Sequence, residues 1–122
     1  GWLKPRIYLP TVLIENLPRE QIAAIVAHEM AHAILGLAPK SQELELKADR
    51  MALVMMTRAG YDIDRAISYW KDAVHPHAEY QETSKTHPSI NARYENFKKE
   101  QARIERLIAS GKDMSFRHNT TE

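Results

Sequence analysis

Residues 22–38 read IAAIVAHEMAHAILGLA, and this stretch decides how the rest of the chain is interpreted. A segment that is apolar on every side is typical of a buried helix. The strongly polar side chains of this one are His28, Glu29 and His32. Because burying two imidazoles and a carboxylate without partners is costly in free energy, we expect the chain to supply a partner for all three.

The spacing H-E-x-x-H suggests that this partner is a zinc ion. Residues four apart lie on one face of a helix, so His28 and His32 can both reach one tetrahedral Zn²⁺. Glu29 then lies beside the metal, where its carboxylate can take a proton from a zinc-bound water. The pattern predicts a zinc-dependent hydrolase, most readily a peptidase. The competing interpretation is a buried helix with two satisfied core histidines.

A zinc hydrolase needs a third protein ligand, and residues 42–59 (QELELKADRMALVMMTRA) supply a candidate. On a helix, Glu45 and Asp49 fall within an apolar arc, whereas Glu43 falls on the polar arc and is rejected. Charged side chains are rarely buried unless they are paired or bound to metal. We therefore expect Glu45 to ligate zinc and Asp49 to accept the free ring N–H of a ligating histidine. The alternative is that both carboxylates reach round to solvent.

Further phrases follow in a fixed order after HEMAH, namely ELKAD at residues 45–49, AGYD at residues 59–62 and THP at residues 86–88 with Arg93 behind it. This order resembles the gluzincin metallopeptidases. The sequence is most similar to the family of the heat-shock membrane peptidase HtpX, the CAAX prenyl proteases and their soluble periplasmic relatives. The resemblance covers roughly residues 6–95.

The resemblance also implies a role for His87, which matches the His-Pro phrase of the family. This imidazole is expected to hydrogen-bond the developing oxyanion or to cap the zinc in a resting state. A purely structural role at the start of a helix is the alternative. The same resemblance implies one zinc ion per chain and a zincin-like fold.

Length and composition set wider bounds. With 122 residues and a formal net charge of +1, a single domain (1–122) with no particular charged partner is expected. The basic residues near the C-terminus alternate with glutamates, which indicates a solvated helix face and not a nucleic-acid surface. The absence of cysteine excludes disulfides and thiolate metal sites without selecting a compartment.

No segment has the length and apolarity of a transmembrane helix, and no signal peptide is visible. A soluble protein of the periplasm or the cytoplasm is therefore expected. Because the chain begins at Gly1, it is also compatible with excision from a longer protein that has partner domains.

The predicted fold class is α+β, a mainly helical zincin-like domain with a small N-terminal sheet. Residues 6–14 (RIYLPTVLI) are rich in β-branched and aromatic side chains and predict one or two short strands. Four helices are expected, at about residues 18–37, 42–59, 63–74 and 88–110. Ser41 and Asp62 are expected to cap the second and the third, and Pro88 and Ser89 to start the fourth.

The predicted function is that of a zinc-dependent endopeptidase acting on peptides or proteins through a metal-activated water, with Glu29 as general base. An extended substrate is expected to pair with the N-terminal strand. Two alternatives stay open: a zinc-stabilised, latent or non-catalytic scaffold of the same fold, and a small helical interaction module without metal.

Overall fold

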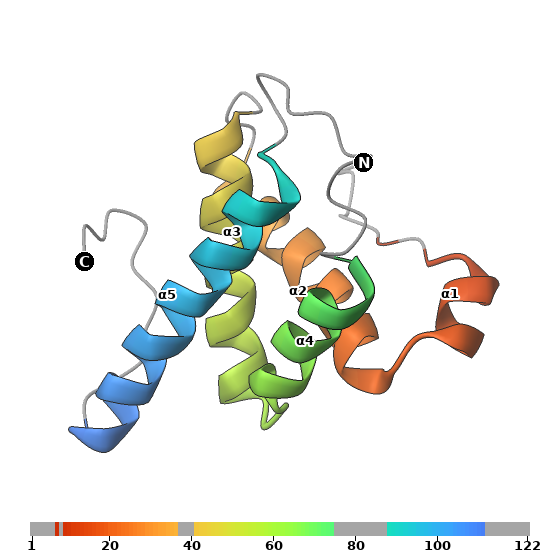
Figure 1. Ribbon diagram of the computed structural model, residues 1–122. Helices are drawn as coiled ribbons and strands as arrows, with labels where there is room; N and C mark the ends of the chain where they lie inside the picture. Colours follow the sequence, from red (N-terminus) through yellow and green to blue (C-terminus); the bar gives the residue numbers. More distant parts are fainter. Residues whose placement is uncertain (1–6, 8, 37–40, 75–87, 112–122) are drawn as a thin grey trace, which may run out of the picture.

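The computed structural model is a bundle of helices in which α3 (Gln42–Arg58) is central (Figure 1). It describes residues 7, 9–36, 41–74 and 88–111. The elements in chain order are α1 (Thr11–Asn16), α2 (Arg19–Leu35), α3 (Gln42–Arg58), α4 (Ile63–Tyr69), a π-helical segment (Trp70–Val74) and α5 (Ile90–Ala109). Helix α3 packs against both α2 and α5, and α4 contacts the same two helices. Helix α1 lies to one side, beyond α2 (Figure 1).

The predicted N-terminal sheet is wrong, and the fold class of the described residues is all-α. Residues 11–16, which include the end of the predicted strand segment, form α1. A strand preference is realised only on a pleated surface beside another strand, and the described part of the chain contains no strand to pair with. Pro10 instead precedes a helix, and its carbonyl accepts the N–H of Ile14 at 3.3 Å. The predicted pairing of substrate with this strand is lost with the sheet.

Side-chain caps fix where three helices begin, and the caps Ser41 and Asp62 are as predicted. Ser41 Oγ accepts the N–H of Leu44 at 3.0 Å at the start of α3. Asp62 caps α4 and Ser89 caps α5 in the same way, each at 3.0 Å. Since these oxygens satisfy N–H groups that have no partner within the helix, they hold the first turns of α3, α4 and α5 in place.

The apolar core lies where α3 meets α2, α4 and α5. Its buried members come from all four helices: Ala27, Ala52, Leu53, Val54, Met56, Ile63, Ala66, Ile67 and Ile104. Helix α2 contributes only one side to this packing, because Met30 and Ile34 on its other side are 43% and 51% exposed. The expectation that α2 is buried on every side is therefore wrong, and the helix places its motif at the edge of the core.

Candidate metal centre

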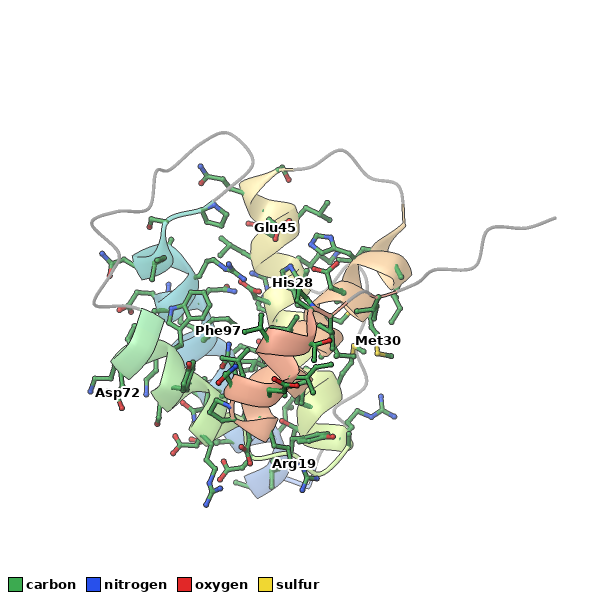
Figure 2. All side chains as sticks on the ribbon, turned by 90° about the vertical axis from the view of Figure 1, so that its right-hand side faces the viewer. Arg19, His28, Met30, Glu45, Asp72 and Phe97 are labelled. Carbon is green, nitrogen blue, oxygen red and sulfur yellow. The ribbon has the colours of Figure 1, made fainter. Side chains whose placement is uncertain are left out.

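The packing of α2 against α3 brings three potential metal ligands together. His28 Nε2 lies 3.1 Å from one carboxylate oxygen of Glu45, and His32 Nε2 lies 3.0 Å from the other. The two imidazole nitrogens are 3.1 Å apart. One ligand atom from each of the three residues therefore lies within 4.8 Å of the others, a group that could hold a metal ion. Figure 2 shows His28 and Glu45 next to one another on their two helices.

The donor set fits a zinc ion. Two histidine nitrogens and one carboxylate oxygen form a common ligand set of catalytic zinc, and at bond lengths of about 2.0–2.2 Å tetrahedral ligand atoms lie roughly 3.3–3.6 Å apart. The observed separations of 3.0–3.1 Å are close to this range. If a neutral His28 donates its Nδ1–H to Asp49, the Nε2 atom on the other side of the ring carries a lone pair that faces the Glu45 carboxylate. Because two acceptors repel each other, a proton or a cation is needed between them.

Asp49 lies directly behind His28. Its Oδ1 is 2.8 Å from Nδ1 of His28, and its side chain is only 2% exposed. A carboxylate in this position fixes both the tautomer and the orientation of the ring, so that Nε2 faces Glu45. Glu43, the rejected ligand, is 74% exposed and pairs with Arg50 on the outer side of α3.

Arg93 of α5 holds Asp49 in turn. Its Nε donates to Oδ2 of Asp49 at 2.8 Å and its Nη2 donates to Oδ1 at 2.9 Å, a two-pronged ion pair of the kind that arginine favours. The guanidinium of Arg93 also lies over the ring of Trp70, 4.8 Å from its centroid, and Trp70 meets Phe97 edge to face at 5.2 Å. The buried negative charge is thus balanced by a cation that packs against an aromatic ring.

These contacts change the acid–base properties of the three residues. Burial by itself would lower the pKa of His28, but the hydrogen bond and the charge of Asp49 outweigh burial and raise it above 6.5. Burial would raise the pKa of Asp49, but hydrogen bonds from His28 and Arg93 lower it below 3.8. Burial would likewise lower the pKa of Arg93, and Asp49 raises it. Asp49 is therefore held ionised and Arg93 protonated.

Glu29 takes a different position from its two neighbours in the motif. It is exposed, and together with His28 it forms part of the wall of a cavity of about 300 Å³. As an exposed residue of this wall, Glu29 can present its carboxylate to a molecule that enters from that side. His87 lies outside the described residues, and its expected role stays a prediction.

Arg93 is the residue of the site that the sequence-based ligand analysis missed. The sequence patterns place Arg93 behind the His-Pro phrase and among the basic residues of a solvated helix face, and for Arg93 that second expectation is wrong, because it pairs with the buried Asp49. A stronger signal was present, because Arg93 lies in the same helical stripe as Ile90, Phe97 and Ile104 of α5. A lone cation within an apolar stripe indicates a buried anionic partner, and in the structure that partner is Asp49.

Comparisons with known proteins give the class to which this fold and site belong. Residues 33–101 match the model of peptidase family M48, over more than half of the chain. The chain therefore belongs to peptidase family M48, a metallopeptidase family with HtpX-like and CAAX-protease-like members, and the resemblance seen in the sequence is confirmed. The matched segment contains Glu45, Asp49 and Arg93 and begins directly after His32. No curated protein and no solved structure matches the chain significantly.

In the described part of the chain, no helix combines the length and the apolarity needed to cross a bilayer.

Proposed function

We propose that this chain is a zinc-dependent endopeptidase in which His28, His32 and Glu45 bind one zinc ion. The observation that carries the proposal is the convergence of these three ligand atoms within 4.8 Å. Asp49 and Arg93 support it, because they orient His28 and balance the buried charge behind it. Membership of family M48 supports the peptide bond as the substrate.

The residues divide the chemistry between them. A zinc ion held by His28, His32 and Glu45 would supply a Lewis acid that polarises the scissile carbonyl and makes the attacking water more acidic. Glu29 accepts a proton from the attacking water and delivers it to the leaving amine. Its exposed position beside the cavity leaves its carboxylate accessible to both partners. Asp49 keeps the ring of His28 turned toward Glu45 throughout.

The ligand assignment is tested by the metal content of paired variants. Glu45→Gln should lose zinc after dialysis against a weak chelator, because a neutral amide is a much poorer ligand than a carboxylate. Glu43→Gln is the matched control, since this neighbour on α3 is 74% exposed and pairs with Arg50. It should retain one zinc ion per chain. Retention of the full zinc content by Glu45→Gln would refute the assignment, and His28→Ala should lose zinc as Glu45→Gln does.

The role of Glu29 is tested by hydrolysis of an unfolded protein substrate. Glu29→Gln should retain zinc but hydrolyse the substrate roughly 10²–10⁴-fold more slowly, which is the usual loss when a general base is removed. Glu43→Gln should keep the wild-type rate. A wild-type chain that binds zinc but hydrolyses no peptide bond would instead identify the non-catalytic, zinc-stabilised scaffold.

A further inference from the structure

The cavity beside the candidate metal centre has a wall that combines apolar side chains with residues of the HExxH motif. Its volume is about 300 Å³, and residues of α2, α3, the α4 region and α5 line it. Most of the lining is apolar, from side chains such as Leu53, Met56, Ile67 and Phe97, while His28 and Glu29 belong to the same wall. A molecule held in this cavity therefore touches both the apolar core and the residues proposed to perform hydrolysis.

Two buried polar atoms of residues that line this cavity have no hydrogen-bond partner in the part of the chain that the structure describes. They are Oε1 of Gln21, an acceptor, and Nε1 of Trp70, whose N–H is a donor. Gln21 is only 9% exposed. Because buried polar groups are almost always satisfied in folded proteins, such orphaned atoms call for an explanation. Asp49 and Arg93, also in the wall, are by contrast bound to each other.

The orphaned N–H of Trp70 does not result from a loosely held ring. Arg93 covers the face of the indole at 4.8 Å, and Phe97 meets it edge to face at 5.2 Å. Trp70 is also the first residue of the π-helical segment, a local widening of a helix that is frequent at functional sites. The ring is thus fixed by other contacts, which leaves its N–H available to a ligand.

Gln21 is aligned with the metal-site residues of its helix. It precedes His28 by seven residues, two helical turns, and Ala24 and Ile25 between them line the same cavity. The opposite side of α2, with Ile22, Val26 and Met30, borders a second cavity. Figure 2 shows Met30 and Phe97 on opposite sides of this helix. The Gln21 amide is therefore on the His28 side.

We propose that this cavity receives a side chain of the peptide substrate, and that Gln21 and Trp70 make it select tyrosine over phenylalanine. The inference rests on the proposed peptidase function. An aromatic ring suits the apolar wall, and a phenolic hydroxyl can both accept from the indole N–H and donate to an amide oxygen. A site whose buried polar groups await a hydroxyl discriminates strongly against the analogue that lacks it, since those groups then stay unpaired.

The test measures binding and needs no hydrolysis. The zinc-loaded Glu29→Gln chain is titrated with N-acetyl-tyrosinamide and with N-acetyl-phenylalaninamide in a calorimeter. The tyrosine amide should bind roughly 10-fold or more tightly than the phenylalanine amide. In a nitrogen-15 correlation spectrum, the indole N–H signal of Trp70, assigned through Trp70→Phe, should shift on addition of the tyrosine amide. The phenylalanine amide should shift it much less.

Variants then assign the preference to the two orphaned atoms. Gln21→Met replaces the buried amide with an apolar chain of similar shape, so it should fold normally and lose most of the tyrosine preference. Its affinity for the phenylalanine amide should be unchanged. Trp70→Phe should also reduce the ratio of the two affinities. Tyr61→Phe is the control, because Tyr61 lines the second cavity, and it should keep the wild-type ratio.

Equal affinity for the two amides, no binding of either, or an unchanged ratio in both Gln21→Met and Trp70→Phe overturns the proposal. Water would then be the partner of the orphaned atoms. Failure of this inference is distinct from failure of the proposed function. If the chain hydrolyses peptides but does not distinguish the two amides, the proposed function stands and the tyrosine pocket is refuted. If the chain prefers the tyrosine amide but hydrolyses no peptide, the tyrosine pocket stands and the proposed function is refuted.

Discussion

The two halves of α3 bury inward side chains of opposite chemistry. In residues 42–50, Glu45 and Asp49 point toward α2 and α5, and Asp49 is 2% exposed. In residues 51–58, the inward side chains are apolar, and Met56 is also 2% exposed. The same helix therefore carries a charged interior at one end and a hydrocarbon interior at the other.

This difference separates what stabilises the fold from what shapes the site. Burial of an apolar side chain such as Leu53 or Met56 contributes about 1.5–3 kcal/mol to stability. A buried ion pair such as Asp49–Arg93 contributes little net free energy, because the cost of removing both charges from water offsets their attraction. We expect the second half of α3 to supply the stability that keeps the first half in its arrangement.

Removal of Arg93 should have the largest effect, because it leaves Asp49 buried without its main counter-charge. We expect Arg93→Leu to reduce the free energy of unfolding of the zinc-free chain by about 3–5 kcal/mol. Arg65→Leu is the matched control. Its side chain is 73% exposed, so its ion pairs should contribute less than about 1 kcal/mol. Urea unfolding measures both, and equal losses would show that burial of the Asp49 pair is unimportant.

Ile104→Ala tests the apolar half of the comparison. Ile104 of α5 is 1% exposed in the core cluster that contains Leu53 and Met56. Its truncation should lower the free energy of unfolding by about 2–5 kcal/mol through lost burial and a new cavity. The zinc content of the folded protein should stay at the wild-type level, because Ile104 belongs to the apolar core and not to the proposed ligand group. Loss of zinc at full folding would mean that the two halves of α3 are coupled more tightly than proposed.

Asp49→Asn should act on the site more than on the fold. The amide keeps the shape of the carboxylate but loses its charge, so the ring of His28 becomes a poorer and less firmly oriented ligand. Zinc affinity should fall roughly 10- to 100-fold, as measured by competition with a chromophoric chelator. Asp64→Asn, which changes an exposed residue of α4 that accepts from Gln101, should leave the affinity unchanged. An unaltered affinity in Asp49→Asn would end the role assigned to Asp49.

The smallest expected effect comes from removing the serine caps at the starts of α3 and α5. Ser41→Ala and Ser89→Ala each remove one 3.0 Å bond to a first-turn N–H, and each should destabilise the chain by about 1 kcal/mol. Only Ser41→Ala should also weaken zinc binding, because Glu45 is in the first turn of the helix that Ser41 caps. Chelator competition on the two variants checks this, and an equal effect on zinc affinity would argue against local control of Glu45.

Much of the helical framework and part of the site could be read from local sequence patterns. The capping residues Ser41 and Asp62 predicted two helix starts correctly, because a cap and its helix are neighbours in the chain. Pro88 and Ser89 marked the start of α5 within two residues. Helical spacing predicted that His28 and His32 share a face and that Glu45 and Asp49 point inward. The structure brings all four together, and their roles as ligands and partner of zinc remain proposals.

Only the tertiary structure decided the rest, because it depends on contacts between residues that are distant in the chain. The strand prediction failed since a strand needs a partner, and the described residues supply none, so residues 11–16 became a helix. The pairing of Arg93 with Asp49 joins residues 44 positions apart, and no local pattern specifies it. The cavity with its orphaned Gln21 and Trp70 atoms likewise arises only when four helices pack around it. The sequence by itself determined which side chains face inward, whereas packing determined what each of them meets.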